Sequence, residues 1–295
     1  MSDFALPAQA RLIPPQLFPA FTGDGGSSSP RIGLALGGGF SGAIAHVGVL
    51  RVFERAGVRI SAIAGISAGS IVAAAFASGA SLDEISATAA SMRFSDVARW
   101  SISKMGLAKS RRMATFLRRL LRQQRFERMC KPLAVVATDL GTGEPTVFRD
   151  SGEVIDPIRA SCAYPGLMEP VCINDRLYVD GAIGQEIPVI PLRDMGMDRV
   201  IAVRLSSSWL QQPTDIFEVV RRCVRIMNEH SQQSWRSRSD LVIEPEVSSN
   251  KWNDFAGAQW LIESGERAAT RALPAIREWL QADATRAAHA ARAEG

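Results

Sequence analysis

A G-x-S-x-G motif at residues 65–69 constrains this chain more than any other feature. It joins a short apolar run, residues 61–64, to a segment of small residues typical of a closely packed helix. A turn of this kind holds its serine in a strained, exposed position at the end of a strand. The motif therefore predicts a nucleophile elbow with Ser67 as the candidate nucleophile. Gly65 and Gly69 are needed there because a Cβ would clash as the backbone folds back. Segments of small residues also match the motif by chance, so a plain tight turn is the alternative.

A glycine-rich segment, residues 37–42, follows the apolar run Ile32–Leu36 and precedes a helical pattern. It spells G-x-G-x-x-G, which after a strand is the fingerprint of a dinucleotide-binding turn. That fingerprint requires a carboxylate about 20 positions later, at the end of the second strand, to bind the ribose. The second apolar run instead ends in the Ser67 turn, and Glu54 lies inside the intervening helical pattern. Nucleotide binding is therefore the disfavoured alternative.

The same glycines are suited to binding an anion. Without side chains, the backbone N–H groups of Gly37, Gly38 and Gly39 can point inward, and the following helix adds the positive end of its dipole. This segment and Ser67 both follow the carboxyl ends of strands, where open α/β sheets build their sites. We therefore expect N–H groups near Gly38 and Gly39 to bind the oxyanion that forms when Ser67 attacks a carbonyl. Removing one such donor typically costs about 3 kcal/mol of transition-state stabilisation.

A serine nucleophile needs a base, and the three histidines do not supply an obvious one. His46 lies in the first predicted helix, His230 in a polar late helix and His289 in the C-terminal tail. None follows a strand on a turn, and a helix residue with a satisfied ring is the simpler interpretation of His46. One carboxylate stands out, because Asp180 ends a short strand and precedes two small residues that allow another loop to approach. For a lone Asp-Gly pair, a turn aspartate is the usual interpretation.

Apolar runs alternate with helical patterns along the chain, which predicts an α/β fold with a mostly parallel central sheet sandwiched between helices. Strands are expected at residues 32–36, 60–64, 133–138, 176–182, 199–205 and 241–244. Helices are expected at residues 42–56, 69–79, 82–93, 110–129, 215–233 and 259–273. Residues 1–30, rich in Pro, Gly and Ser, are interpreted as a flexible leader and residues 31–280 as the α/β domain. Residues 281–295 are interpreted as an Ala/Arg-rich tail that frays.

Composition narrows the functional classes. The 295 residues, 46% of them hydrophobic, suffice for one large core or at most two small ones. A net charge of +4 is too small to indicate a nucleic-acid partner. The four cysteines form no C-x-x-C pair and the three histidines show no ligand spacing, so no metal and no cofactor is expected. Reduced cysteines, and the lack of a signal-peptide pattern or a long uncharged apolar run, predict a cytoplasmic protein without a membrane-spanning segment.

The order of these motifs resembles that of the patatin-like phospholipase family. A glycine-rich loop comes first, G-x-S-x-G follows, and a D-G-[AG] sequence lies far downstream, here Asp180-Gly181-Ala182. Three further segments, 132–144, 160–171 and 174–189, are similar to bacterial members. The resemblance covers residues 31–205.

The resemblance implies a lipid acyl hydrolase with a Ser–Asp dyad, which needs no histidine. Ser67 would be the nucleophile, Asp180 its base and orienter, and Gly37, Gly38 and Gly39 the oxyanion loop. The expected reaction is hydrolysis of carboxylic esters in phospholipids, lysophospholipids or related lipids, through an acyl-serine. An aspartate of ordinary pKa is a weak base at neutral pH, so burial beside Ser67 has to raise the pKa of Asp180.

This chain departs from the family pattern at one position. The family usually has Arg or Lys where this chain has Ser41, and that cation is thought to support the oxyanion loop. Its loss implies lower activity, a different acyl substrate, or a patatin-fold module that binds lipid or protein without turnover. Arg159 and Arg204 are the candidates to replace it.

The segment Lys109–Arg128 is basic and amphipathic. At about 100° per residue, Arg111, Arg118, Arg122 and Arg125 fall on one stripe, opposite an apolar arc. Such a helix can lie on anionic lipid, which suggests peripheral contact with the inner membrane face. The simpler interpretation is that the apolar arc packs on the sheet and the arginines are solvated.

Overall fold

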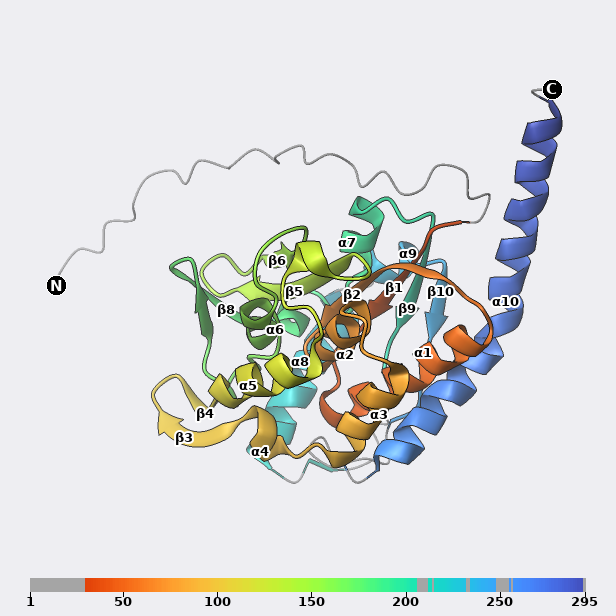
Figure 1. Cartoon of the computed structure of the whole chain (residues 1–295). Coiled ribbons are helices and arrows are strands. Elements are labelled where there is room, and N and C mark those ends of the chain that lie inside the picture. Colours follow the sequence, from red (N-terminus) through yellow and green to blue (C-terminus); the bar gives the residue numbers. More distant parts are fainter. Residues whose placement is uncertain are drawn as a thin grey trace, which may run out of the picture.

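The computed structural model describes residues 30–205, 212–213, 215–231, 234–247, 255 and 257–293. Figure 1 shows a central sheet with helices on both faces. The strands are β1 (Ile32–Leu36), β2 (Ile60–Ile66), β3 (Arg99–Ser103), β4 (Gly106–Lys109), β5 (Leu133–Asp139), β6 (Pro145–Phe148), β7 (Val171–Ile173), β8 (Arg176–Asp180), β9 (Arg199–Val203) and β10 (Leu241–Ile243). The α-helices are α1 (Ala45–Arg55), α2 (Ala68–Ala77), α3 (Leu82–Ser91), α4 (Phe94–Val97), α5 (Arg111–Leu120), α6 (Ile155–Ser161), α7 (Val189–Asp194), α8 (Ile216–Ser231), α9 (Ser234–Ser237) and α10 (Ala258–Ala293). Short 3₁₀ helices are η1 (Phe40–Ile44), η2 (Phe126–Arg128) and η3 (Gly181–Ile183).

The main sheet has eight strands in the order β10-β9-β1-β2-β5-β8-β7, with β6 paired to β5 outside this path. β10, β9, β1, β2 and β5 pair in parallel. β6 and β8 pair antiparallel with β5, and β7 pairs antiparallel with β8. The structure therefore confirms the predicted α/β fold with a mostly parallel sheet between helices.

Side chains alternate between the two faces of the sheet, and each face has its own core. On β1, Leu34 and Leu36 join the larger core with α1, α2 and α10. Ala35 joins the smaller core, which is rich in alanine from β2, β5 and β9. These small residues allow α7 and the ring of Trp235 to lie close to the sheet. Continuous apolar runs such as β5 are buried at every residue, as expected for a strand covered on both faces.

Several segments differ from the sequence predictions, and β6, β7, α4, α6, α7 and α9 were not predicted. The helix predicted at 110–129 ends at Leu120, because the backbone N–H of Arg122 donates to Ser78 and Arg125 forms a β-bridge with Glu153. The hairpin β3–β4 was not predicted, and α10 continues through the predicted tail as far as Ala293. Of the predicted leader, residues 1–30, all but Pro30 lie outside the described residues. Within the described part of the chain, no helix is both long and apolar enough to cross a bilayer.

The helices α1 and α10 cross with their backbones in contact. A Cβ on Gly48 of α1 would lie 1.9 Å from the carbonyl oxygen of Ile262. A Cβ on Gly265 of α10 would lie 1.9 Å from the carbonyl oxygen of Ala45. These distances are far below van der Waals contact, so only glycine fits at either position.

We predict that Gly48→Ala lowers the free energy of unfolding by about 2 kcal/mol or more, measured by urea denaturation. Separating the two backbones costs more than the roughly 1 kcal/mol gained in helix propensity. Ala87→Ser, on the exposed side of α3, is the control and should change stability by less than about 0.5 kcal/mol. An unchanged or more stable Gly48→Ala protein would contradict the packing described above.

Candidate active site

Ser67 and Asp180 meet because two strands end on the same edge of β5. β2 pairs in parallel with the first half of β5, and its last residue, Ile66, lies opposite Val136. β8 comes from the other direction along the second half of β5, and its last residue, Asp180, lies opposite Ala137. β6 pairs with both halves of β5 and so occupies its other edge. The register therefore places Ser67, one residue beyond β2, beside Asp180 across a sequence separation of 113 residues.

Ser67 occupies the sharp turn between β2 and α2 that the sequence predicts. Its backbone angles are φ 52° and ψ −134°, a conformation that residues with a side chain rarely adopt. A Cβ on Gly65 would lie 2.4 Å from the Cα of Ser70, and a Cβ on Gly69 would lie 2.4 Å from the carbonyl oxygen of Gly37. The two glycines are therefore what permits the elbow to close and to pack on the glycine loop.

The hydroxyl of Ser67 donates a hydrogen bond to Oδ2 of Asp180 at 2.7 Å. Oδ1 of the same carboxylate accepts the backbone N–H of Ala182 at 2.9 Å. The Asp180 side chain is completely buried, and Ser67 is 7% exposed. Burial raises the pKa of Asp180 to about 7, although the hydrogen bonds from Ser67 and Ala182 act in the opposite direction. A carboxyl group with this pKa is matched to proton transfer near neutral pH.

A buried serine, Ser161 at the end of α6, fixes the elbow to β5. Its Oγ accepts the backbone N–H of Ser67 at 2.8 Å and donates to the carbonyl oxygen of Val136 at 2.6 Å. On the other side, Oγ1 of Thr138 donates to the carbonyl oxygen of Asp180 at 3.0 Å. Both members of the Ser67–Asp180 pair are thus held by hydrogen bonds to neighbouring strands and helices, which favours a fixed geometry.

The glycine loop lies directly against Ser67. A Cβ on Gly38 would lie 3.0 Å from the Cβ of Ser67. The N–H of Gly37 donates to the carbonyl oxygen of Val203 at 3.1 Å and so continues the sheet. Across the residues that the structure describes, the N–H groups of Gly38 and Gly39 have no hydrogen-bond acceptor. Of the three glycines, Gly38 and Gly39 are the ones whose amides are available to an anion beside Ser67.

His46, in α1, holds the glycine loop through a hydrogen bond. Its Nε2 lies 2.8 Å from the carbonyl oxygen of Gly37, so Nε2 carries the proton and donates. Burial lowers the pKa of His46 to about 4, so the ring is neutral at physiological pH. The ring is only half satisfied, because within the described residues Nδ1 has no partner. His46 is therefore a positioning group for the glycine loop, and it does not contact the Ser67 hydroxyl.

Three aromatic rings connect the end of the glycine loop to α8. Phe40, which follows the glycine loop, packs against Tyr164 and Phe217 with ring centroids 5.3 and 5.5 Å away. Phe217 belongs to α8, and farther along the same helix Asn228 donates to the carbonyl oxygen of Ala182 at 2.7 Å. α8 therefore contacts both the loop that carries the glycines and the turn that follows Asp180.

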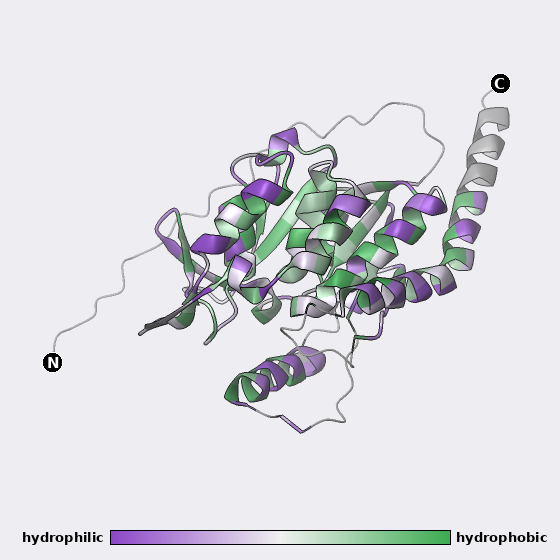
Figure 2. Cartoon of the chain, turned by 60° about the horizontal axis from the view of Figure 1, so that its bottom comes forward, coloured by the Kyte–Doolittle hydropathy of each residue, from purple (hydrophilic) through white to green (hydrophobic). Residues whose placement is uncertain are grey.

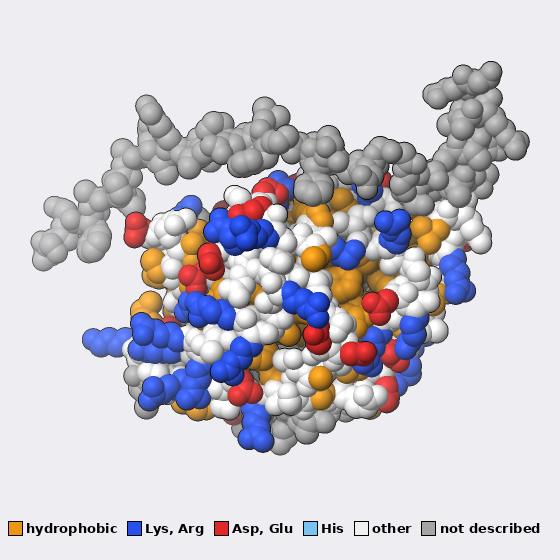
Figure 3. Space-filling model, viewed as in Figure 1, with side chains coloured by type: hydrophobic (Ala, Val, Ile, Leu, Met, Phe, Trp, Pro, Cys, Tyr) orange, Lys and Arg blue, Asp and Glu red, His pale blue; other side chains and the backbone are white. Residues whose placement is uncertain are grey.

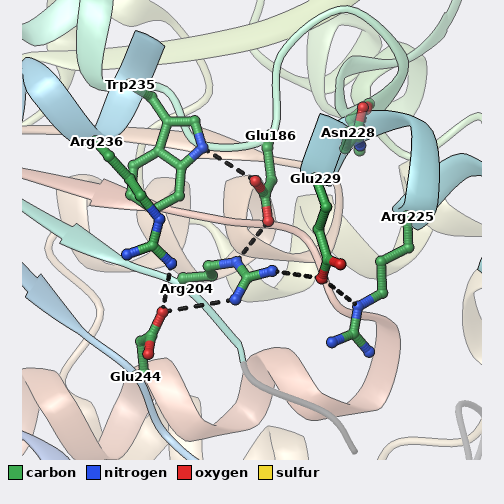
Figure 4. Close-up of polar contacts among 9 residues, drawn as sticks. Glu186, Arg204, Arg225, Asn228, Glu229, Trp235, Arg236 and Glu244 are labelled. Atoms are coloured by element: carbon green, nitrogen blue, oxygen red, sulfur yellow. Dashed lines mark hydrogen bonds and ion pairs between the residues drawn. The ribbon is translucent and has the colours of Figure 1, made fainter. Parts of the chain in front are cut away.

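Arg204 does not stand in for the cation that the family pattern has at Ser41. Figure 4 shows its guanidinium among Glu186, Glu229 and Glu244, with N–O distances of 2.7, 2.9 and 3.5 Å. Trp235 donates to the other oxygen of Glu186 at 3.0 Å, and Arg225 contacts Glu229 at 3.2 Å. This network ties α8 and α9 to the end of β9.

Arg159 is also engaged elsewhere. Its guanidinium bonds to Asp156 at 2.6 Å and to Ser110 at 3.2 Å. Neither predicted substitute for the missing cation is therefore held at the glycine loop. Ser41 itself, in η1, is buried.

The basic segment Lys109–Arg128 is not one amphipathic helix. Its helical part, α5, packs its apolar residues Met113, Ala114 and Leu117 into the core. Arg122, predicted on the basic stripe, lies beyond the helix and binds Glu84 at 2.7 and 2.8 Å. The apolar residues of α5 therefore lie in the core, and membrane contact through this segment stays a prediction.

Sequence reasoning missed three supporting residues. Ser161 lies in the segment similar to bacterial patatin-like proteins, but no spacing rule linked it to Ser67. His46 does not follow a strand, so the sequence did not favour it as a catalytic residue. Asn228 lies in no recognisable motif. Within the described residues, no group of three or more His, Cys, Asp or Glu side chains is arranged to hold a metal ion.

The chain is similar in sequence to several known proteins. The NTE family protein Rv1063c of Mycobacterium tuberculosis is 36% identical over 186 residues, 62% of this chain and 51% of that protein. The NTE family protein Rv2565 of the same organism is 27% identical over 300 residues, with 90% of this chain and 51% of that protein covered. Patatin-like phospholipase domain-containing protein 6 of Mus musculus is 28% identical over 201 residues, which cover 63% of this chain and 14% of that protein.

The fold has a solved counterpart in VipD from Legionella pneumophila, with a TM-score of 0.58 and 13% sequence identity over 84% of this chain and 67% of that one. The chain spans about half the length of the mycobacterial relatives that it matches. The model of the patatin-like phospholipase family matches residues 34–193, more than half of the chain, and this range contains the glycine loop, the elbow and Asp180. The chain therefore belongs to the patatin-like phospholipase family.

Proposed function

We propose that this protein is a serine lipid acyl hydrolase that cleaves carboxylic esters of phospholipids, lysophospholipids or related lipids. The observation that carries the proposal is the 2.7 Å hydrogen bond from the Ser67 hydroxyl to the buried carboxylate of Asp180. Burial raises the pKa of that carboxyl to about 7. An activated serine beside a matched base, on a strained elbow, is the arrangement that nucleophilic catalysis needs.

In this mechanism Asp180 takes the proton of Ser67 as Oγ attacks the ester carbonyl. The carbonyl oxygen becomes an oxyanion, which the N–H groups of Gly38 and Gly39 bind, and Gly37 shapes the loop through its bond to the sheet. Asp180 then gives the proton to the leaving alcohol, which departs and leaves an acyl-serine. Water attacks this ester with Asp180 again as base, and the fatty acid and free Ser67 are released.

The family and the apolar surroundings support a lipid ester as substrate. The relatives include a protein named for its patatin-like phospholipase domain. Beside the site, the rings of Phe40, Tyr164 and Phe217 form an apolar cluster where an acyl chain can be accommodated.

A binding module without turnover is the second candidate, and Ser41 favours it. Neither Arg159 nor Arg204 supplies the cation that the family usually has at that position. The two candidates differ in whether Ser67 forms a covalent intermediate.

We predict that a lipid-like fluorophosphonate labels Ser67 and that Asp180→Ala lowers the labelling rate by at least about a hundredfold, because general-base assistance is worth roughly 10² to 10⁴. Mass spectrometry of the labelled protein locates the adduct. Asp150→Ala, at an exposed turn, is the control and should label at the wild-type rate. A folded wild-type protein that forms no adduct would favour the binding module.

We predict that the labelling rate rises with pH and reaches half its maximum near pH 7. Asp180 acts as a base only when ionised, and the pKa of its carboxyl is raised to about 7, so the protonated and inactive form dominates below that value. His46 does not contribute to this limb because burial lowers its pKa to about 4. Single-turnover labelling from about pH 5 to 9 measures the profile. A flat profile would exclude Asp180 as the base.

We predict that Ser161→Ala slows labelling of Ser67 by about tenfold and lowers the free energy of unfolding by roughly 1–3 kcal/mol. The substitution leaves the buried N–H of Ser67 without its acceptor, which loosens the elbow. Ser86→Ala is a matched control, since Ser86 is a buried serine that donates to a backbone carbonyl within α3. Equal labelling rates in the two variants would show that Ser161 does not position the nucleophile.

A further inference from the structure

The helix α8 presents its apolar residues to solvent. Six residues, spaced three or four apart, share an arc of about 120° on the exposed side. These are Ile216, Val219, Val220, Cys223, Ile226 and Met227. Ile216 is 81% exposed and Met227 is 67% exposed. In Figure 2, α8 lies at the foot of the molecule and carries green, hydrophobic residues along its length. A surface helix usually has the opposite arrangement, with its apolar stripe in the core.

The inward side of α8 carries several polar residues beside Phe217. It carries Asn228, which binds the turn after Asp180, and Glu229, which binds Arg204. Two buried polar atoms at this contact, Tyr164 OH and Arg221 Nε, have no hydrogen-bond partner among the described residues. Burial and the nearby Asp180 carboxylate raise the pKa of Tyr164, so its hydroxyl stays protonated. Unpartnered buried polar atoms weaken the packing of α8 on the site.

A second exposed apolar element lies on the same side of the molecule. The hairpin β3–β4 exposes Trp100, Met105 and Leu107. Leu107 donates its backbone N–H to the carbonyl oxygen of Leu167, in the loop that starts at Tyr164, and Tyr164 packs on Phe217 of α8 at 5.6 Å. Figure 1 shows α8 and this hairpin at its lower side. We call the exposed side chains of α8 and of this hairpin the docking face.

The surroundings of the docking face are strongly positive. Residues 99–119 contain seven Lys and Arg and no Asp or Glu. All seven are exposed, and they are Arg99, Lys104, Lys109, Arg111, Arg112, Arg118 and Arg119. Figure 3 shows Lys and Arg gathered at the lower left of the molecule, over α5 and the hairpin. An apolar surface beside a cluster of cations is complementary to a bilayer with anionic headgroups.

We propose that the docking face binds the surface of an anionic phospholipid bilayer, with the apolar side of α8 among the upper acyl chains. The choice of a lipid partner rests on the proposed function, since α8 also contacts Phe40 after the glycine loop and the turn that follows Asp180. Insertion of the apolar arc gives α8 a favourable environment away from the site, and release of its weak inward contacts opens a path from the bilayer to Ser67. The basic cluster acts over a longer range and orients the protein on the surface.

Flotation with vesicles tests this proposal in a Ser67→Ala protein, which leaves the lipid intact. Vesicles of phosphatidylcholine alone are compared with vesicles that also contain phosphatidylserine. The face variant is Ile216→Ser with Met227→Ser, and the matched control is Leu140→Ser with Leu177→Ser, two exposed leucines outside the docking face. Circular dichroism and thermal melting establish that both variants are folded.

We expect binding to the phosphatidylserine vesicles and at least about a tenfold loss of it in the face variant, while the control binds like its parent. Equal binding by the face variant and the control, or no vesicle binding by the parent, would overturn the proposal. So would a size-exclusion shift from dimer to monomer in the face variant with vesicle binding unchanged, because the face would then join two copies of the chain.

A separate measurement keeps the two proposals apart. Wild-type protein is labelled in solution with a small, monomeric fluorophosphonate, which needs no bilayer. Labelling at Ser67 without vesicle binding would overturn the docking face and leave the hydrolase in place. Vesicle binding without labelling supports the docking face and removes the hydrolase.

Discussion

The meeting of β2 and β8 on one edge of β5 is the contact on which the site depends. One strand ends opposite Val136 and the other opposite Ala137, so the residues at their ends have to share a small space. That space is nearly closed to solvent, since Asp180 is completely buried and Ser67 is 7% exposed. Asp180 is buried there without a cationic partner among the described residues, and burial is the largest cause of its raised pKa. The topology thus places the carboxylate and also gives it the basicity that the proposed chemistry needs.

Close backbone contact is the second constraint, and it explains where glycine is found. Gly69 lies against the glycine loop, Gly38 against Ser67, and Gly181 against the carbonyl oxygen of Val136 at a Cβ distance of 2.3 Å. Each glycine removes a side chain where two segments of the site meet. The segments can then approach closely enough for Ser161 to bridge the elbow and β5. Glycine placement and side-chain hydrogen bonding therefore act together to fix the geometry around Ser67.

Much of this arrangement could be predicted from the sequence, and the exceptions have a common cause. The elbow, the glycine loop and β1, β2, β5 and β9 follow from local patterns, because their apolar runs and small residues are contiguous. The pairing of Ser67 with Asp180 came from family resemblance, since no local rule joins residues so far apart. Ser161, His46 and the early end of α5 depend on contacts between distant segments, such as that of Arg122 with Ser78. Local helix propensity predicted a longer α5, and tertiary contacts overrode it.

The polarity of α8 links the site to the surface of the molecule. An apolar helix face that is exposed to water lowers the stability of the protein. A second environment that stabilises this face gives a physical reason for its presence beside a buried site. Its inward contacts reach the glycine loop through Phe217 and the Asp180 turn through Asn228. A change in the surroundings of the outer face therefore acts on both halves of the proposed catalytic machinery. In the proposed docking, the inward contacts and the apolar arc belong to the same helix, so access to Ser67 and attachment to a bilayer would be two consequences of one equilibrium.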